Sequence, residues 1–213
     1  MNYIKVLELL CLCVGLIRYK KLDPSYLRWV VAIVAITVIQ EILVVNIIKL
    51  YNPTFRNLTY NIFSFFEMFV WLGFFYVVHR GHQIAQIIIP VGIVIAVYSL
   101  IELNFLKNWE SLHTNSYRIY ELFVLVLSFA YLVRLLKKDS YHPTFSDSIF
   151  WVCSACIIFH AMLMVNFTVL VERNYWNLKN SRELFNFLHN IGNTFYYLLL
   201  CVSFLTGSFF RSR

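Results

Sequence analysis

The chain has 213 residues, of which 60% are hydrophobic and 14% charged, and its mean hydropathy is +0.68. This composition excludes an ordinary soluble globular domain. The formal net charge of +7 does not indicate nucleic-acid binding, because the basic residues punctuate the ends of apolar segments and form no stripe. All five cysteines lie within apolar segments, so a disulfide framework is not indicated either.

Apolar runs fill the chain in succession, and a membrane-spanning helix needs roughly 20 such residues. The first run is short and carries Lys5 and Glu8, but no small-residue cleavage site follows it, so we expect a retained helix and not a signal peptide. The sequence predicts an all-α, polytopic transmembrane bundle of about seven helices, or six if the first run does not span. We expect one integral membrane domain over residues 1–213, without a soluble domain. The seven runs are Tyr3–Ile17, Tyr26–Ile48, Tyr60–Val78, Ile84–Phe105, Tyr117–Leu136, Ile149–Leu170 and Leu184–Phe209.

The basic residues predict the orientation of the bundle. If the seven runs alternate in direction, ten of the 18 lysines and arginines fall on one side of the membrane. The positive-inside rule then places the N-terminus outside and the C-terminus inside. These ten residues are Arg18, Lys20, Lys21, Arg28, Arg80, Arg134, Lys137, Lys138, Arg211 and Arg213.

Polar side chains gather in the predicted outward half of several helices. Glu67 lies about two turns below Tyr60 and costs the most to bury, since a charged group at the bilayer centre costs about 2.5–3.5 kcal/mol. Helical spacing places Tyr60 on the same face as Glu67. Similar polar faces recur at the same depth on the second, fifth and seventh runs. The four faces together predict a polar pocket, open toward the outside, that binds a small ligand or ion, with Glu67 and His189 central. The candidate ligand-binding residues are Glu67, His189, Asn190, Asn193, Glu41, Glu121, Arg118 and Tyr60.

Two other interpretations of these polar residues stay open. They could serve structure alone, because polar side chains in membrane bundles often only hydrogen-bond a neighbouring helix. Glu67 would then be protonated or paired with Arg118 or Arg56 to hold the bundle together. Catalysis by Glu67 or His189 is the third interpretation, and we expect no enzymatic activity.

A cysteine and histidine pattern in the sixth run does not reach a metal site. Cys153 and Cys156 are one turn apart and His160 follows four residues later. A structural zinc site needs about four such ligands, and no second set is evident in that run, so the pattern indicates apolar packing. We therefore expect no metal and no cofactor.

The last two runs contain short, loosely defined sequence motifs. Phe150-Trp151 opens the sixth run after a loop with His142-Pro143, and the seventh contains His189-Asn190-Ile-Gly-Asn193-Thr-Phe-Tyr196-Tyr197. In this layout the chain resembles small bacterial seven-helix membrane proteins, similar to the membrane sensor modules that are attached to histidine kinases or encoded beside them. The resemblance implies a bacterial inner-membrane location, signal reception in the outer half of the bundle, and transmission to a cytoplasmic partner.

We therefore expect a non-enzymatic membrane sensor or accessory module that regulates a separate cytoplasmic protein. The partner would dock on the basic inner loops, where Arg134, Lys137 and Lys138 could equally contact anionic lipid headgroups. The alternative is an oligomeric pore or small transporter, including a membrane effector or regulator of a bacterial defence system. A pore should form homo-oligomers and pass ions, whereas a sensor should not pass ions.

Overall fold

The computed structural model describes residues 3–22, 24–44, 55–106, 114–137, 144–176 and 181–209. These ranges contain seven α-helices and no strand, which confirms the predicted all-α bundle. Each apolar run of the sequence corresponds to one helix. The helices are α1 (Tyr3–Arg18), α2 (Leu27–Val38), α4 (Phe55–Val78), α5 (Gln83–Ile101), α6 (Thr114–Leu136), α7 (Ser148–Trp176) and α8 (Ser181–Phe209).

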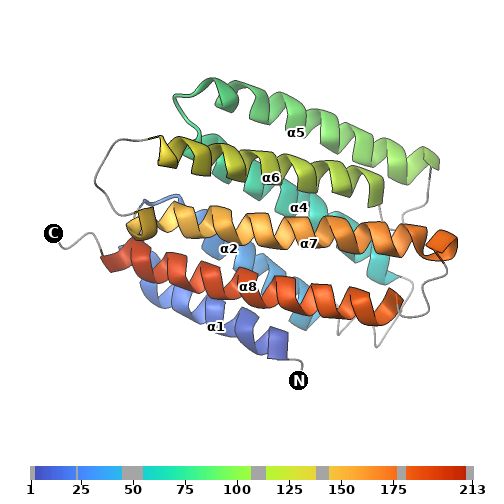
Figure 1. Cartoon of the computed structure of the whole chain (residues 1–213), viewed down its shortest axis with the longest axis horizontal. Helices are drawn as coiled ribbons and strands as arrows, with labels where there is room; N and C mark the ends of the chain where they lie inside the picture. Colours follow the sequence, from blue (N-terminus) through green and yellow to red (C-terminus); the bar gives the residue numbers. More distant parts are fainter. Residues whose placement is uncertain are drawn as a thin grey trace.

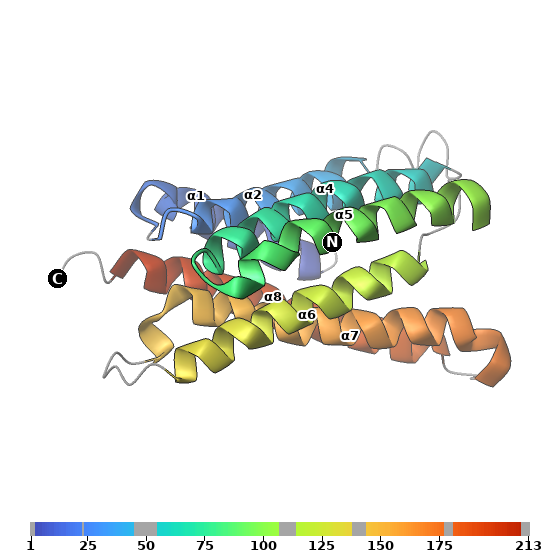
Figure 2. The same cartoon turned by 90° about the horizontal axis from the view of Figure 1, so that it is seen from above.

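The helices run side by side and close into a ring (Figure 1). Each helix packs against the next in chain order, and α8 returns to pack against α1. Seen from above, α1, α2, α4 and α5 form one layer, and α6 and α7 form the other (Figure 2). Helix α4 also contacts α6 across the ring, and its Trp71, Phe74 and Phe75 are fully buried. The core therefore contains large aromatic side chains from α4.

The outer surface of the bundle is apolar. Among the described residues, four helices are long and apolar enough to cross a membrane: Asn57–Val78, Gln83–Leu106, Thr114–Leu136 and Ser148–Asn166. Large apolar side chains on these helices point outward, which suits contact with lipid and not with water. The chain is therefore a helical membrane protein. Outward-facing examples are Phe66, Phe69, Ile93, Val94, Leu122, Val126 and Phe129.

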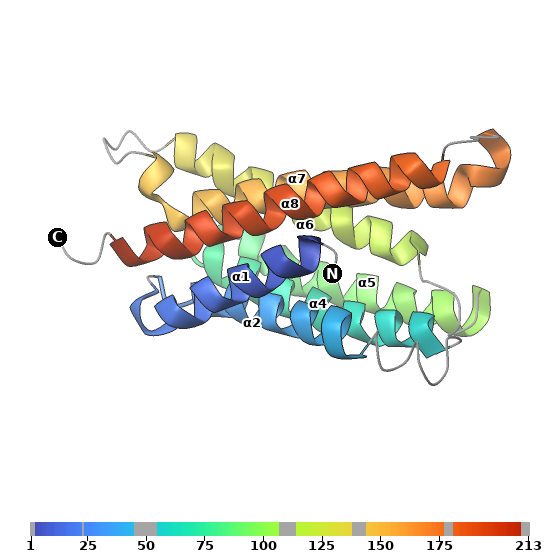
Figure 3. The ribbon, with the colours of Figure 1, turned by 90° about the horizontal axis from the view of Figure 1, so that it is seen from below.

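Helix α1 is shorter than these four segments. Its 16 residues rise about 24 Å at the usual 1.5 Å per residue, less than the roughly 30 Å of a hydrocarbon core. It begins partway along the bundle (Figure 3). The buried face of α1 includes Glu8 and Cys11, so this helix carries an acidic side chain into the interior.

Successive helices alternate in direction. The last residues of α4, α6 and α8 and the first residues of α5 and α7 therefore lie at one end of the bundle (Figure 3). Arg18, Arg80, Arg134 and Lys137 belong to this end, which we call the basic end. Three residues of the predicted basic set, Lys138, Arg211 and Arg213, lie outside the described residues, as does the His142-Pro143 loop.

Short π-helical segments extend α2 and α5 at the opposite end, and each contains an acidic residue. Ile39–Val44 contains Glu41, and Glu102–Leu106 contains Glu102. The buried Glu102 carboxylate accepts hydrogen bonds from the backbone N–H groups of Asn115 (3.1 Å) and Ser116 (2.8 Å) and from the Ser116 hydroxyl (2.7 Å). Glu102 thus caps the positive N-terminus of α6 from a neighbouring helix, which explains why it is buried.

Replacing Glu102 by alanine should destabilise the bundle, because it removes the acceptor for these donors at the start of α6. We expect Glu102→Ala to lower the free energy of unfolding by about 1–3 kcal/mol, measured by denaturation in mixed detergent micelles. Glu102→Gln keeps one acceptor oxygen and should lose less. Equal losses in the two variants would contradict the capping role.

Candidate functional site

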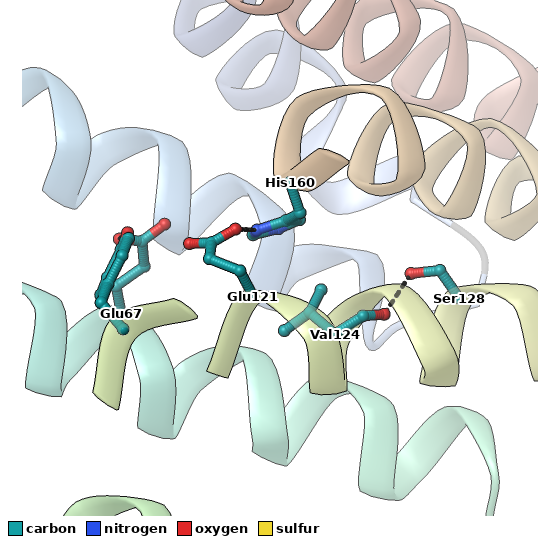
Figure 4. Close-up of polar contacts among 6 residues, drawn as sticks. Glu67, Glu121, Val124, Ser128 and His160 are labelled. Atoms are coloured by element: carbon teal, nitrogen blue, oxygen red, sulfur yellow. Dashed lines mark hydrogen bonds and ion pairs between the residues drawn. The ribbon is translucent and has the colours of Figure 1, made fainter. Parts of the chain in front are cut away.

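A carboxylate and an imidazole meet in the interior of the bundle. Glu121 of α6 and His160 of α7 are both fully buried, and His160 Nδ1 contacts Glu121 Oε2 directly (Figure 4). Both residues belong to segments apolar enough to span a membrane. A pair of this kind is stable inside a membrane only when each group satisfies the other, because neither has water as a substitute partner.

Glu67 of α4 lies on the opposite side of Glu121 from His160 (Figure 4). Its carboxylate accepts a hydrogen bond from the Tyr117 hydroxyl of α6 at 3.4 Å. Glu121 and His160 both interact with it electrostatically. Glu67, Tyr117, Glu121 and His160 form one group, which we call the interior cluster.

Aromatic rings surround the imidazole. Trp71 of α4 and Tyr120 of α6 stand edge-on to His160, with ring centroids 6.3 and 6.2 Å away, and Phe159 stands at 5.4 Å. These rings surround the cluster with apolar side chains. The local dielectric constant is therefore low, and charge interactions inside the cluster are strong.

Some buried polar atoms of the interior cluster have no hydrogen-bond partner among the described residues. They are Glu121 Oε1 and His160 Nε2, with Tyr120 Oη beside them. Buried polar atoms are nearly always paired, and an exception calls for an explanation such as a functional role or a bound water or ion. The cluster therefore keeps both an acceptor oxygen and a ring nitrogen available for a further group.

A small cavity adjoins this cluster between α4, α5 and α6. Its volume of about 10 Å³ leaves room for about one water molecule. The hydroxyl-bearing residues Tyr117 and Tyr120 line both the cavity and the cluster. Nothing larger than water fits there without movement of the helices. The other lining residues are Ser64, Phe65, Met68, Ser99 and Ser116.

Two further predicted residues, Glu41 and Tyr60, meet at a second place, nearer the end opposite the basic end. Tyr60 donates a hydrogen bond to Glu41 Oε1 at 2.8 Å, and Lys5 Nζ donates to the Glu41 carbonyl oxygen at 3.0 Å. Glu8 of α1 is buried, hydrogen-bonds Tyr197 of α8 and interacts electrostatically with Glu41. We call Lys5, Glu8, Glu41, Tyr60 and Tyr197 the outer cluster.

The polar residues of α8 contribute less directly. His189 is exposed, stacks on Phe185 at 5.9 Å, and interacts electrostatically with Glu41. The buried Asn193 amide donates to the His189 carbonyl oxygen at 2.8 Å. The Asn190 carbonyl oxygen accepts from Thr194, and Arg118 is half-buried next to Tyr117.

The predicted pocket residues are thus divided between two clusters. Glu67 and Glu121 belong to the interior cluster, whereas Glu41 and Tyr60 belong to the outer one, with His189 near Glu41. The sequence pattern predicts that His160 packs with Cys153 and Cys156 on an apolar face, yet in the structure it is the direct partner of Glu121. Its position near mid-depth of an apolar run was the signal that could have identified it.

The helices of the interior cluster are joined again at the basic end. Arg134 of α6 donates to the Val78 carbonyl oxygen at 3.0 Å, and Tyr131 donates to Asp147 at 2.6 Å, just before α7. His79 Nε2 lies 3.1 Å from the Leu127 carbonyl oxygen. Burial lowers the pKa of His79, the first residue after the α4 span, to about 4, so His79 is neutral at pH 7 and its ring N–H donates this bond.

Comparison with known proteins does not assign this site, since no protein family, curated protein or solved structure matches the chain. Within the described residues, no three histidine, cysteine or acidic side chains come together as metal ligands. The chemistry of the site therefore follows from its own groups: two carboxylates, one imidazole and one phenol, with the Tyr120 phenol beside them.

Removing one partner of the buried pair should leave the other unpaired. We expect Glu121→Ala or His160→Ala to lower the free energy of unfolding by about 3–5 kcal/mol. The double variant should lose less than the sum of the two single losses, because the interaction is shared. Denaturation in mixed detergent micelles measures all three losses.

Ser128 supplies the matched control for this experiment. It is as buried as Glu121 on the same helix, and its hydroxyl donates to the Val124 carbonyl oxygen of that helix at 2.9 Å (Figure 4). Ser128→Ala should cost no more than about 1 kcal/mol. Strictly additive losses for Glu121 and His160 would show that the two side chains do not stabilise one another.

Proposed function

We propose that this protein is a non-enzymatic multi-pass membrane sensor or accessory module that reports the state of its interior cluster to a separate cytoplasmic protein. The observation that carries the proposal is the buried Glu121–His160 pair, which joins α6 to α7 in the interior of the bundle. A buried pair of this kind responds to anything that changes the charge or hydrogen bonding of either member.

The packing supplies a route from the interior cluster to the basic end. The three helices that carry the interior cluster, α4, α6 and α7, are the same three that Arg134 and Tyr131 join near the basic end. A change in the packing of α6 against α7 at Glu121 would therefore alter the contacts of Arg134 and Asp147. Stacked rings continue between the two places: Trp71 on Phe75 at 5.8 Å, and Phe75 on His79 at 6.3 Å.

We place the basic end in the cytoplasm of a bacterial cell, with seven spans in the inner membrane, the N-terminus outside and the C-terminus inside. The positive-inside rule supports this orientation. Exposed basic side chains such as Lys137 then face an acidic partner protein, as in the histidine-kinase-associated modules that the layout resembles. The outer cluster faces the opposite side, where a signal would arrive.

The interior packing supports a sensor over a pore through one copy of the chain. Between the interior cluster and the basic end, the described core contains Trp71, Phe74 and Phe75 of α4 and Phe204 of α8, all fully buried. These large rings occupy this part of the core, so a pore would be expected between several copies of the chain and not through one copy.

Flux measurements separate these two functions. In liposomes containing the folded protein, we expect no passage of ions or small dyes, and no difference between the parent and Glu67→Gln. Empty liposomes and liposomes with a known channel give the two reference values. Flux that Glu67→Gln alters would replace the sensor by a pore or transporter whose pathway includes the cluster.

A spin label can test whether a change in the interior cluster is transmitted to the basic end, which we call the relay. Lys137 is exposed and directly follows α6, and the exposed Cys13 can be replaced by serine, since the other four cysteines are buried. With the label on Lys137→Cys, Glu121→Gln should change the mobility of the label, because it removes the charge from the α6–α7 pair. Ser128→Ala should leave the label unchanged. Identical spectra for all variants would contradict the relay.

A further inference from the structure

The structure narrows what the interior cluster can bind. Its adjoining cavity holds about one water molecule, and aromatic rings of Trp71, Tyr120 and Phe159 stand around His160. An organic ligand would have to displace these rings. The available atoms are an acceptor oxygen on Glu121 and a ring nitrogen on His160. Both kinds of atom accept a proton, an imidazole nitrogen near neutral pH and a carboxylate oxygen ordinarily in more acidic solution.

The groups that face the cluster come from several helices. Tyr117 and Tyr120 of α6 and Cys156 of α7 interact electrostatically with one or both of its glutamates, and Arg118 follows Tyr117 on α6. Tyr196 and Tyr197 of α8 also interact with Glu67. The α5 side of the cavity contributes Ser99, which does not titrate. Phenols and thiols ordinarily lose their protons only well above pH 7, which leaves the carboxyl groups of Glu67 and Glu121 and the imidazole of His160 as the acceptors for an incoming proton.

We propose that the ligand of the interior cluster is the proton, so that acidification outside the cell releases the Glu121–His160 pair and loosens α6 from α7. The step is a transfer from water to a carboxylate oxygen of the cluster. A proton on Glu121 removes the negative charge that His160 contacts. Loss of that charge in a medium of low dielectric constant weakens the contact between the two helices. This inference rests on the proposed function, because it names the signal that the sensor receives.

Protonatable side chains lead from the cluster toward the outer end of the bundle. Tyr197 interacts with Glu67 and hydrogen-bonds Glu8, which is electrostatically linked to Glu41. Glu41 is bound by Tyr60 and is electrostatically linked to the exposed His189. Chains of acidic, phenolic and imidazole groups of this kind carry protons in membrane proteins. The outer cluster therefore acts as the entry for protons.

The experiment uses Trp71 as its reporter, because this ring stands edge-on to His160. In the full chain, Trp29, Trp109, Trp151 and Trp176 are replaced by phenylalanine, and the protein is reconstituted in lipid nanodiscs. Emission is followed between pH 5 and pH 8, above the range in which His79 titrates. A proton on Glu121 changes the charge beside His160 and the packing of the ring against it, so the emission of the parent should show one sigmoidal change with pH.

The variants decide whether this change belongs to the cluster. Glu121→Gln and His160→Gln should abolish it. Glu67→Gln should shift its midpoint by at least one pH unit, a tenfold change in proton affinity, because it removes a neighbouring charge. Ser128→Ala should titrate like the parent. Helix content and thermal midpoint, measured on each sample, confirm that only folded protein is compared, and Glu67→Gln keeps the test decisive if the other two variants unfold.

Two results would overturn the inference: a flat emission from the folded parent, or the same titration in Glu67→Gln, Glu121→Gln and the parent. The label on Lys137→Cys separates this failure from a failure of the sensor. If the Trp71 emission does not change with pH but the label still responds to Glu121→Gln, the proton is not the ligand, and the coupling of the interior cluster to the basic end is retained. A titrating Trp71 signal with an unresponsive label retains the proton site and rejects the relay.

Discussion

The contact between Glu121 and His160 is the most demanding interaction in this bundle, because two polar groups give up water inside an apolar assembly. Neither residue could be buried alone without a large cost in free energy. Their contact fixes the rotation of α6 against α7, since a turn of either helix by one residue would separate them. The positions of Tyr117, Tyr120 and Phe159 around the pair follow from that rotation.

The polar residues and the large aromatic residues occupy different parts of the interior. Glu41, Tyr60 and Glu8 form a cluster toward one end, and Glu67 continues it inward to Glu121. Beyond Trp71, stacked rings continue along α4 through Phe75 to His79. A change at the interior cluster can therefore reach the basic end through the packing of these helices.

Most of the fold was predictable from local patterns. Seven apolar runs predicted seven helices, since a backbone in lipid must satisfy its own hydrogen bonds within each helix. The outcome is clearest for α6, predicted over Tyr117–Leu136 and observed over Thr114–Leu136. Three of the seven helices, α1, α2 and α8, fall outside the four segments that length and composition alone mark as spans. Their polar residues, including Glu8 and Glu41, turn toward the interior.

By itself the sequence determined which residues share a helix face and that acidic groups lie within apolar runs, because these depend on helical periodicity and on the length of each run. Only the tertiary structure decided which faces meet. It placed His160 against Glu121, joined Glu41 to Tyr60 apart from Glu67, and gave Glu102 the separate task of capping α6. Periodicity specifies a direction around one helix axis, whereas a partner depends on the order and rotation of neighbouring helices, which the packing of the whole bundle sets.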